Sequence, residues 1–127
     1  MSTVDDQIAD YLGSLSGPDR DDAFHRLIEL GAVVIPYLEQ AFTNAVDART
    51  RQTLVTIAWQ TRSRQSLPFL QHALEDASGD VWKEALDGLV AIGGPEALDL
   101  VQRMRSRTTS DKRQWFDEAI QQITENL

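Results

Sequence analysis

The sequence contains no cysteine, and it has only two histidines, four prolines and seven glycines among 127 residues. Without cysteine there are no disulfides, thiolate metal ligands or thiol nucleophiles. No apolar run approaches the length of a membrane span. The acidic N-terminus, MSTVDDQIAD, lacks the basic and apolar regions of a signal peptide. These absences predict a cytoplasmic protein, and its length suits one domain with a sizeable core.

Residues for catalysis or metal binding are also scarce. His25 shares a predicted helix face with Asp22 and Glu29, but three such side chains usually form a salt-bridged surface. No HExxH motif and no cysteine pair accompanies them. The serines lack a nucleophile-elbow setting, and Gly93-Gly94-Pro95 is typical of a turn between helices. The sequence therefore predicts a protein that is not an enzyme and has no cofactor and no metal ion.

A repeated segment is the main feature that the sequence does contain. Residues 22–42, DAFHRLIELGAVVIPYLEQAF, return as residues 84–104, EALDGLVAIGGPEALDLVQRM, without a gap. The shift equals two periods of about 31 residues, and a weaker copy lies between them. Such a period indicates an α-solenoid or another helical array. The alternative is a chance similarity between two amphipathic helix pairs.

Each copy has the pattern of a helical hairpin. Apolar residues recur at helical spacing on both sides of Gly31, which suits a helix end because glycine adopts left-handed backbone angles without strain. Pro36 fits only in the first turn of the second helix. Neither helix can bury its stripe alone, so neighbouring hairpins must stack. We expect four equivalent core positions, at Leu27, Leu38, Leu89 and Leu100.

The segments LIELGAVVIPYLEQAF and LVAIGGPEALDLVQRM resemble the HEAT-like repeats first noted in phycobilisome lyases. In those repeats a helix ends in Leu-Gly and the next helix opens with a proline. The middle copy departs from the pattern, because its turn is two residues longer and lacks the glycine. The resemblance implies an all-α fold, a short α-solenoid of about three hairpins. We expect repeats at 18–43, 45–76 and 80–106, with caps at 3–15 and 110–126.

Local signals predict further details. Ser2 and Thr3 are each followed three residues later by an aspartate, the signature of a capping box. Asn44 is expected to cap a helix that runs to about residue 61. Trp82 and Trp115 lie on inward stripes and are expected in the core. Trp59 either packs against the next hairpin or stands exposed as an aromatic anchor.

Charge is distributed unevenly around a net value of −8. Two segments, residues 48–74 and 103–113, each carry a net charge of +4, and the rest of the chain is acidic. The basic segments either pair with carboxylates of neighbouring repeats or form a second binding site. Their basic residues are Arg49, Arg51, Arg62 and Arg64, then Arg103, Arg105, Arg107, Lys112 and Arg113.

Other HEAT-like families suggest further functions. Some hydroxylases hold iron with His-Glu dipeptides, and this chain has no such dipeptide. The alkylpurine DNA glycosylases use a basic face, whereas this chain has a pI near 4.6 and would repel phosphates. Bilin lyases have longer repeat arrays than the three repeats predicted for this chain. A nucleic-acid-binding protein or a lyase-type enzyme therefore ranks third among the functions considered.

A protein-binding surface is the main functional prediction. In a solenoid of this kind the second helices line the binding face, and alignment of the repeats places outward residues in rows across it. Tyr37 and Phe69 would supply apolar anchors among carboxylates and amides. The alternative is that neighbouring helices cover both rings. The expected partner-binding residues are Tyr37, Glu39, Gln40, Phe69, His72, Glu75, Asp76, Asp99 and Gln102.

The acidic charge favours a basic protein partner, without membrane or small-molecule ligand. By analogy of size and charge, the specific hypothesis is a bacterial immunity protein that neutralises a basic toxin or effector enzyme. The alternative is a general cytoplasmic scaffold or adaptor.

Overall fold

A computed structural model describes residues 3–127, which form eight α-helices and two short 3₁₀ helices, with no β-strand in that range. The all-α prediction is confirmed. In chain order the α-helices are α1 (Val4–Ser14), α2 (Arg20–Leu30), α3 (Ile35–Asn44), α4 (Ala48–Gln60), α5 (Leu67–Ala73), α6 (Gly79–Ile92), α7 (Gly94–Arg105) and α8 (Arg113–Glu125). The 3₁₀ helices are η1 (Gly31–Val34), before α3, and η2 (Arg64–Ser66), before α5.

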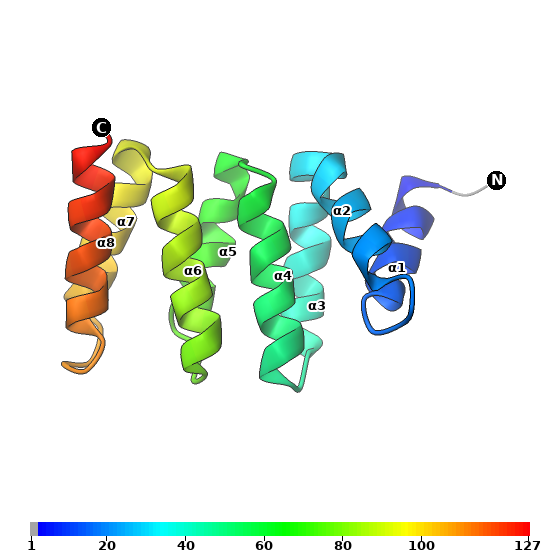
Figure 1. The fold of residues 1–127 in the computed structure, drawn as a ribbon, viewed down its shortest axis with the longest axis horizontal. Helices are drawn as coiled ribbons and strands as arrows, with labels where there is room; N and C mark the ends of the chain where they lie inside the picture. The colour runs from blue at the N-terminus through cyan, green and yellow to red at the C-terminus, as the bar shows by residue number, and fades with distance from the viewer. Residues whose placement is uncertain (1–2) are drawn as a thin grey trace.

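The helices form a row of hairpins two layers deep. Figure 1 shows α4, α6 and α8 side by side in front of α5 and α7, with α1 and α2 at one end of the row. Each hairpin packs on the next through both of its helices, for example α4 on α6 and α5 on α6. We call the outer side of α2, α4, α6 and α8 the first-helix face. The outer side of α3, α5 and α7 is the second-helix face.

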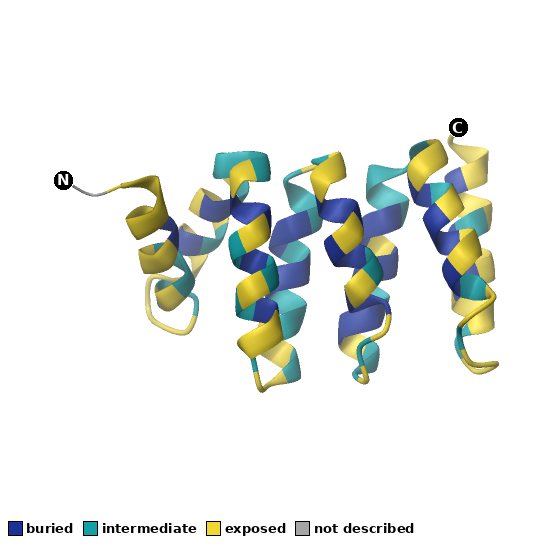
Figure 2. Cartoon of the chain, turned by 180° about the vertical axis from the view of Figure 1, so that it is seen from behind, coloured by how far each residue is buried: buried dark blue, intermediate teal, exposed yellow. Residues whose placement is uncertain are grey.

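The core lies between the two layers and runs along the whole row (Figure 2). Leu27, Leu38 and Leu89 are fully buried, and Leu100 is nearly so, which confirms the four equivalent core positions. Ile57 and Leu70 take the same places in the middle repeat and are fully buried too. A buried leucine of this kind typically contributes about 2–5 kcal/mol, so the repeated leucines provide much of the stacking energy.

The turns within the hairpins follow the predicted pattern, including the longer turn of the middle repeat. Gly31 and Gly93 end α2 and α6 with φ of 73° and 64°, backbone angles that side chains disfavour. In the middle repeat Arg62 takes a left-handed angle, with φ of 57°. Residues 61–66 separate α4 from α5, whereas residues 31–34 separate α2 from α3, so the turn is two residues longer. Contacts with α6 hold Arg62, since its Nη1 donates to the Ala91 carbonyl at 2.8 Å.

Two capping predictions have different outcomes. Thr3 and Asp6 form the expected capping box, with reciprocal bonds of 3.1 and 3.3 Å. The equivalent prediction for Ser2 lies outside the described residues. The prediction for Asn44 is wrong, because α3 continues through that residue and the chain then turns extended. Asp47 caps α4 instead, accepting from the Thr50 amide at 2.8 Å.

The tryptophan predictions are half right. Trp82 is buried, but Trp115 is 46% exposed, so its assignment to the core is wrong. Phe116 is buried in its place. Successive residues on a helix point about 100° apart, and α8 packs mainly on α6 and α7 at the end of the row, so its buried stripe is narrow. Trp115 packs edge-on against Trp82 with 6.0 Å between ring centroids, and the Lys83 ammonium lies 4.3 Å from the Trp115 ring.

Candidate protein-binding surface

The second-helix face carries most of the predicted partner-binding residues. Gln40 lies on α3, Asp99 and Gln102 lie on α7, and all three are exposed. His72 near the end of α5 and Glu75 just after it are exposed too. Glu39 is half-buried. These polar and acidic side chains lie on one face, but the two predicted aromatic anchors and Asp76 do not join them.

Phe69 is fully buried, and its predicted exposure is wrong. The ring packs edge-on against Phe42 of α3, with 5.2 Å between centroids. The physical reason is the length of α5, which has only seven residues and buries four of them. A helix with neighbours on both sides needs a wider apolar stripe than one at the end of a row. Phe69 therefore stabilises the stack and leaves no aromatic ring on this row for a partner.

Tyr37 is half-buried and is attached to the N-terminal cap. Its hydroxyl donates a hydrogen bond to the Asp5 carboxylate of α1. That bond, with the nearby negative charge, raises the pKa of Tyr37 above its usual value. The side chain thus links α3 to α1, and the prediction of a free aromatic anchor is wrong here as well.

Asp76 belongs to a nearly buried ion pair. Its carboxylate accepts from Arg51 Nε at 2.8 Å and from Arg51 Nη2 at 3.3 Å. It also accepts from the Ser78 amide at 2.9 Å. The side chain is only 8% exposed, so the expectation that Asp76 faces outward on the second-helix face is wrong.

A groove lies between α5 and α7 on the second-helix face. It has a volume of about 470 Å³. Pro68 and Pro95 provide its exposed apolar surface, because each proline stands at the first turn of its helix. The groove is lined by Leu67, Pro68, Gln71, Pro95, Glu96, Asp99, Leu100 and Arg103. The sequence predicted these prolines only as helix starters, and no sequence pattern reports the spacing of α5 and α7 that forms the groove.

Exposed ion pairs border the groove. Arg64 Nη1 lies 2.6 Å from Glu96 Oε1, and Arg103 Nε lies 2.9 Å from Asp99 Oδ2. All four side chains are more than half exposed. Such pairs contribute at most about 1 kcal/mol each. A cationic side chain from another molecule can therefore compete for these carboxylates at little cost.

Four of the nine basic residues in the basic segments form ion pairs, three of them across elements and Arg103 within α7. Arg51 pairs with Asp76, Arg64 with Glu96, and Arg105 with Asp117. Each of these pairs joins two helices or the turns beside them. These ion pairs favour the interpretation that the basic segments pair with carboxylates of neighbouring repeats, rather than form a second binding site. Among residues 3–127 the other five basic residues of these segments form no ion pair: Arg49, Arg62, Arg107, Lys112 and Arg113.

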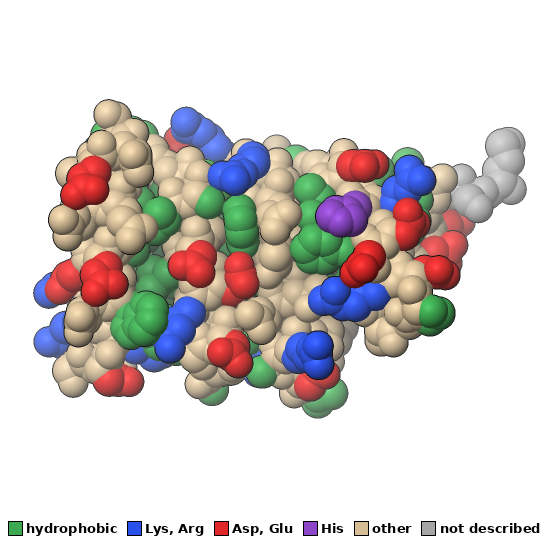
Figure 3. All heavy atoms as spheres, viewed as in Figure 1, with side chains coloured by type: hydrophobic (Ala, Val, Ile, Leu, Met, Phe, Trp, Pro, Cys, Tyr) green, Lys and Arg blue, Asp and Glu red, His purple; other side chains and the backbone are tan. Residues whose placement is uncertain are grey.

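Trp59 packs against the next hairpin. Its Nε1 donates to Glu84 Oε2 at 2.8 Å, and Arg62 lies over the ring with its Cζ 5.1 Å from the centroid. Figure 3 shows the first-helix face, where acidic, basic and hydrophobic side chains are interspersed. The face therefore lacks the continuous basic surface that nucleic-acid binding requires.

The histidines lie in settings typical of surface residues. The ring of His25 packs edge-on against Phe24, at 5.5 Å. Asp22 and Glu29 both approach Arg26, at 3.6 and 4.0 Å. Among residues 3–127 no group of three or more acidic, histidine or cysteine side chains has a geometry that could hold a metal ion. No helix in that range is long and apolar enough to span a membrane.

The family model for HEAT repeats matches residues 35–121, more than half of the chain. The chain belongs to the HEAT repeat family. No curated protein and no solved structure shows significant similarity to it. HEAT repeats act as protein-interaction scaffolds, which agrees with the polar, grooved second-helix face described above. The finer likeness to the phycobilisome-lyase type of HEAT repeat stays a prediction.

Proposed function

We propose that this HEAT repeat protein is a non-enzymatic binding domain that docks a basic protein on its second-helix face. The observation that carries the proposal is the groove between α5 and α7. It combines exposed prolines with the carboxylates of Glu96 and Asp99, in a volume of about 470 Å³. An apolar floor bordered by exposed, exchangeable ion pairs suits a segment that carries lysine or arginine beside apolar residues.

The charge of the molecule supports a basic partner. The net charge is −8, and the second-helix face adds Glu39 and Glu75 to the two carboxylates of the groove. A negative field accelerates encounter with a cationic protein and slows encounter with nucleic acid. The arginines at the groove pair only at exposed positions, so the partner's cations can replace them.

The specific form of the proposal is an immunity protein that covers the active site of a basic toxin or effector enzyme. Small size and an acidic surface support it, because such a surface mimics an anionic substrate. A general adaptor that joins two other proteins is the alternative. A toxin gene adjacent to the gene for this chain, and inhibition of that toxin by the purified protein, would favour the immunity role.

Affinity capture followed by mass spectrometry would identify the partner. Charge-reversal variants would then show which face of the solenoid binds it. Glu96→Lys with Asp99→Lys should lower the association rate about 10-fold, as electrostatic steering predicts. Raising the salt concentration should reproduce that effect. The control is Asp21→Lys with Glu118→Lys, an equal charge change on the first-helix face.

Two outcomes would contradict the proposal. Capture of nucleic acid or of acidic proteins alone would show that the partner class is wrong. Loss of binding in the first-helix control, with normal binding of the groove variant, would show that the face is wrong.

A further inference from the structure

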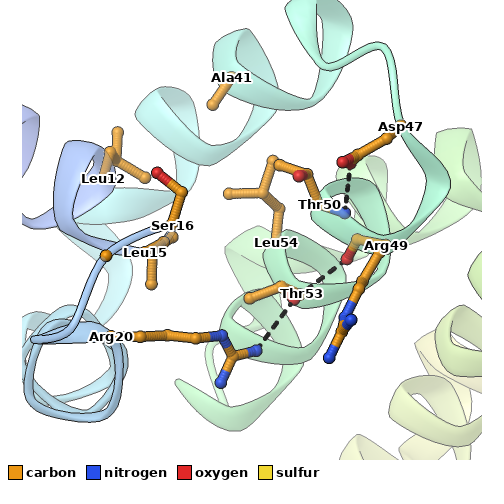
Figure 4. A pocket seen from close by; sticks show the side chains of 11 residues that line it. Leu12, Leu15, Ser16, Arg20, Ala41, Asp47, Arg49, Thr50, Thr53 and Leu54 are labelled. Carbon is orange, nitrogen blue, oxygen red and sulfur yellow. Dashed lines mark hydrogen bonds between the residues drawn. The ribbon is translucent and has the colours of Figure 1, made fainter.

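A second hollow, of about 490 Å³, lies near the N-terminal end of the row. It opens where the turn between α1 and α2 faces α3 and α4 (Figure 4). Its size falls in the range of small-molecule sites, roughly 300–1,000 Å³. The pocket shares no lining residue with the groove between α5 and α7.

The floor of this pocket is apolar and only partly covered. Leu54 of α4 is fully buried beneath it. Leu12, Leu15 and Ala41 come from α1, its C-cap and α3, and all three are half-buried. The core therefore stays partly open to the pocket here, and an apolar group placed there would complete the burial of the three side chains.

Two guanidinium groups stand at one end of the pocket. Arg20 Nη2 donates to Thr53 Oγ1 at 3.3 Å, and Thr53 Oγ1 donates in turn to the Arg49 carbonyl oxygen at 3.1 Å. Figure 4 shows the side chains of Arg20 and Arg49 directed to this same end.

Neither guanidinium is firmly neutralised. Arg49 pairs with no described carboxylate, and Arg20 pairs only with Asp21, at 3.7 Å and with the Asp21 side chain 93% exposed. The other pairs that join separate helices or turns measure 2.8 Å or less. The chain has a net charge of −8, yet these two arginines give one end of the pocket a local positive charge that would attract an anion.

Asp47 reduces the positive potential of the pocket. It lies at the opposite end of the pocket in Figure 4, and the Thr50 amide and hydroxyl hold the pKa of Asp47 below its usual value. The carboxylate is therefore ionised at neutral pH, and it favours placement of an anionic group at the arginine end and of an uncharged group nearer Asp47.

We infer that this pocket binds a monocarboxylate with an apolar tail. The carboxylate would pair with Arg20 and Arg49, and the tail would cover Leu12, Leu15 and Leu54. Bidentate contact with carboxylates is the typical use of arginine. Two sources share this chemistry, a free medium-chain carboxylic acid and the C-terminus of a peptide whose last residue is apolar.

Octanoate is the first probe, with octanol and acetate as the matched controls that lack the charge or the tail. Titration followed by ¹H–¹⁵N NMR should show saturable binding of octanoate, with shifts at the amides of Leu12, Leu15, Thr50 and Leu54. Octanol and acetate should bind at least about 10-fold more weakly, since each loses one of the two interactions.

Substitution of the arginines tests the assignment of the charge. Arg49→Gln and Arg20→Gln should each weaken octanoate binding about 10-fold, the usual effect of losing a charge-assisted hydrogen bond. Arg26→Gln is the control, because Arg26 lies on the same helix as Arg20 and does not line the pocket. All three positions are exposed, so the variants should fold.

A peptide ending in a free leucine, compared with its C-terminal amide, separates the two sources. Tighter binding of the free-acid peptide than of octanoate indicates a peptide C-terminus, and the reverse indicates a small carboxylic acid. The inference is overturned if neither probe binds saturably, if octanol binds as tightly as octanoate, or if Arg26→Gln weakens binding as much as Arg49→Gln. None of these results depends on the protein partner proposed above.

Discussion

Gly88 and Trp59 bring α6 and α4 into direct contact. A Cβ atom at Gly88 would lie 2.6 Å from the Cβ of Trp59 and 2.7 Å from its Cγ. The Cβ of Trp59 is fixed by the backbone, so rotation of the side chain cannot relieve the clash with that atom. The glycine at this position is therefore required by the close approach of the two helices.

We expect Gly88→Ala to destabilise the protein by about 1–3 kcal/mol, the usual cost of overpacking. Gly13→Ala is the matched control, because Gly13 also lies in a helix and a Cβ there would meet no atom within 4 Å. That control should be neutral or should stabilise by up to about 1 kcal/mol. Urea denaturation measures both. A neutral Gly88→Ala would mean that α4 and α6 are farther apart than described.

Asp87 and Asp117 should give opposite pH dependences. Loss of hydration, with Glu84 nearby, raises the pKa of Asp87, whereas the hydrogen bond from Arg105 lowers the pKa of Asp117. A raised pKa means that the stability supplied by Asp87 is present in acid and is lost as the pH rises through that pKa. A lowered pKa means that the stability supplied by Asp117 is lost as the pH falls.

Asp87→Asn should therefore be more stable than the parent protein at pH 7, and the gain should vanish below the ordinary pKa of 3.8. Asp117→Asn should be less stable at pH 7, and its deficit should vanish in acid. Thermal unfolding from pH 3 to pH 7 measures both differences. Parallel curves for the two variants would contradict the assigned environments.

Periodicity identified the buried leucines but misplaced the aromatic residues. Leu27 and Leu89 follow directly from the repeat, because an inward position recurs in every hairpin. Tyr37, Phe69 and Asp99 align with each other, yet they are half-buried, buried and exposed. Their exposure depends on what covers each helix from the side, and a sequence repeat carries no information about that. For this reason Tyr37 and Phe69 were predicted as exposed aromatic anchors, although neither ring is exposed.

At the scale of the elements, one arginine joins two turns. Arg51, in the first turn of α4, donates to the carbonyls of Ala45 and Val46 at 3.2 and 3.1 Å. Its remaining donors reach Asp76, which also accepts from the Ser78 amide and so shapes the turn before α6. Arg51 and Asp76 therefore connect the turn before α4 to the turn before α6 and fix the distance between these two turns.

Asp76→Ala should cost about 3 kcal/mol, since removal of one partner leaves the other charge poorly solvated. Glu96→Ala removes the carboxylate of an exposed pair and should cost less than about 1 kcal/mol. Chemical denaturation of both variants, and of Arg51→Ala for a double-mutant cycle, gives the comparison. Equal losses for the two carboxylates would contradict the difference in burial.

The elements themselves were largely predictable. The Leu-Gly ending and the opening proline located the first hairpin, and the wider spacing of the two helices in the middle copy indicated the longer turn. The cap of α4 was missed, because Asn44 and Asp47 are both good capping residues three positions apart. Only the length of α3 decides between them. The groove was missed because it depends on the spacing of α5 and α7, which no local pattern reports.

At the scale of the whole molecule, the helices differ in the number of neighbours that support them. The central helix α6 packs against α4, α5, α7 and α8, whereas α1 packs mainly on α2. In a solenoid, stability is approximately the sum of each repeat and its nearest-neighbour interfaces. The N-terminal end should therefore open more easily than the centre.

Native-state hydrogen exchange should reveal this gradient. We expect the amides of α1 to exchange through openings of lower free energy than those of α4 and α6. Tyr37→Phe removes the hydrogen bond to Asp5 and should accelerate exchange in α1 without changing α6. Uniform protection along the chain would show that the protein unfolds as a single unit.

The row of hairpins also determines how the molecule would respond to mechanical force. Its first and last helices, α1 and α8, lie at opposite ends of the long axis (Figure 1). A force applied to the two ends would therefore act on the hairpins in series, and each interface would carry the full load. One hairpin after another would then detach from an end of the row. The protein would therefore lengthen in steps, each at a low force.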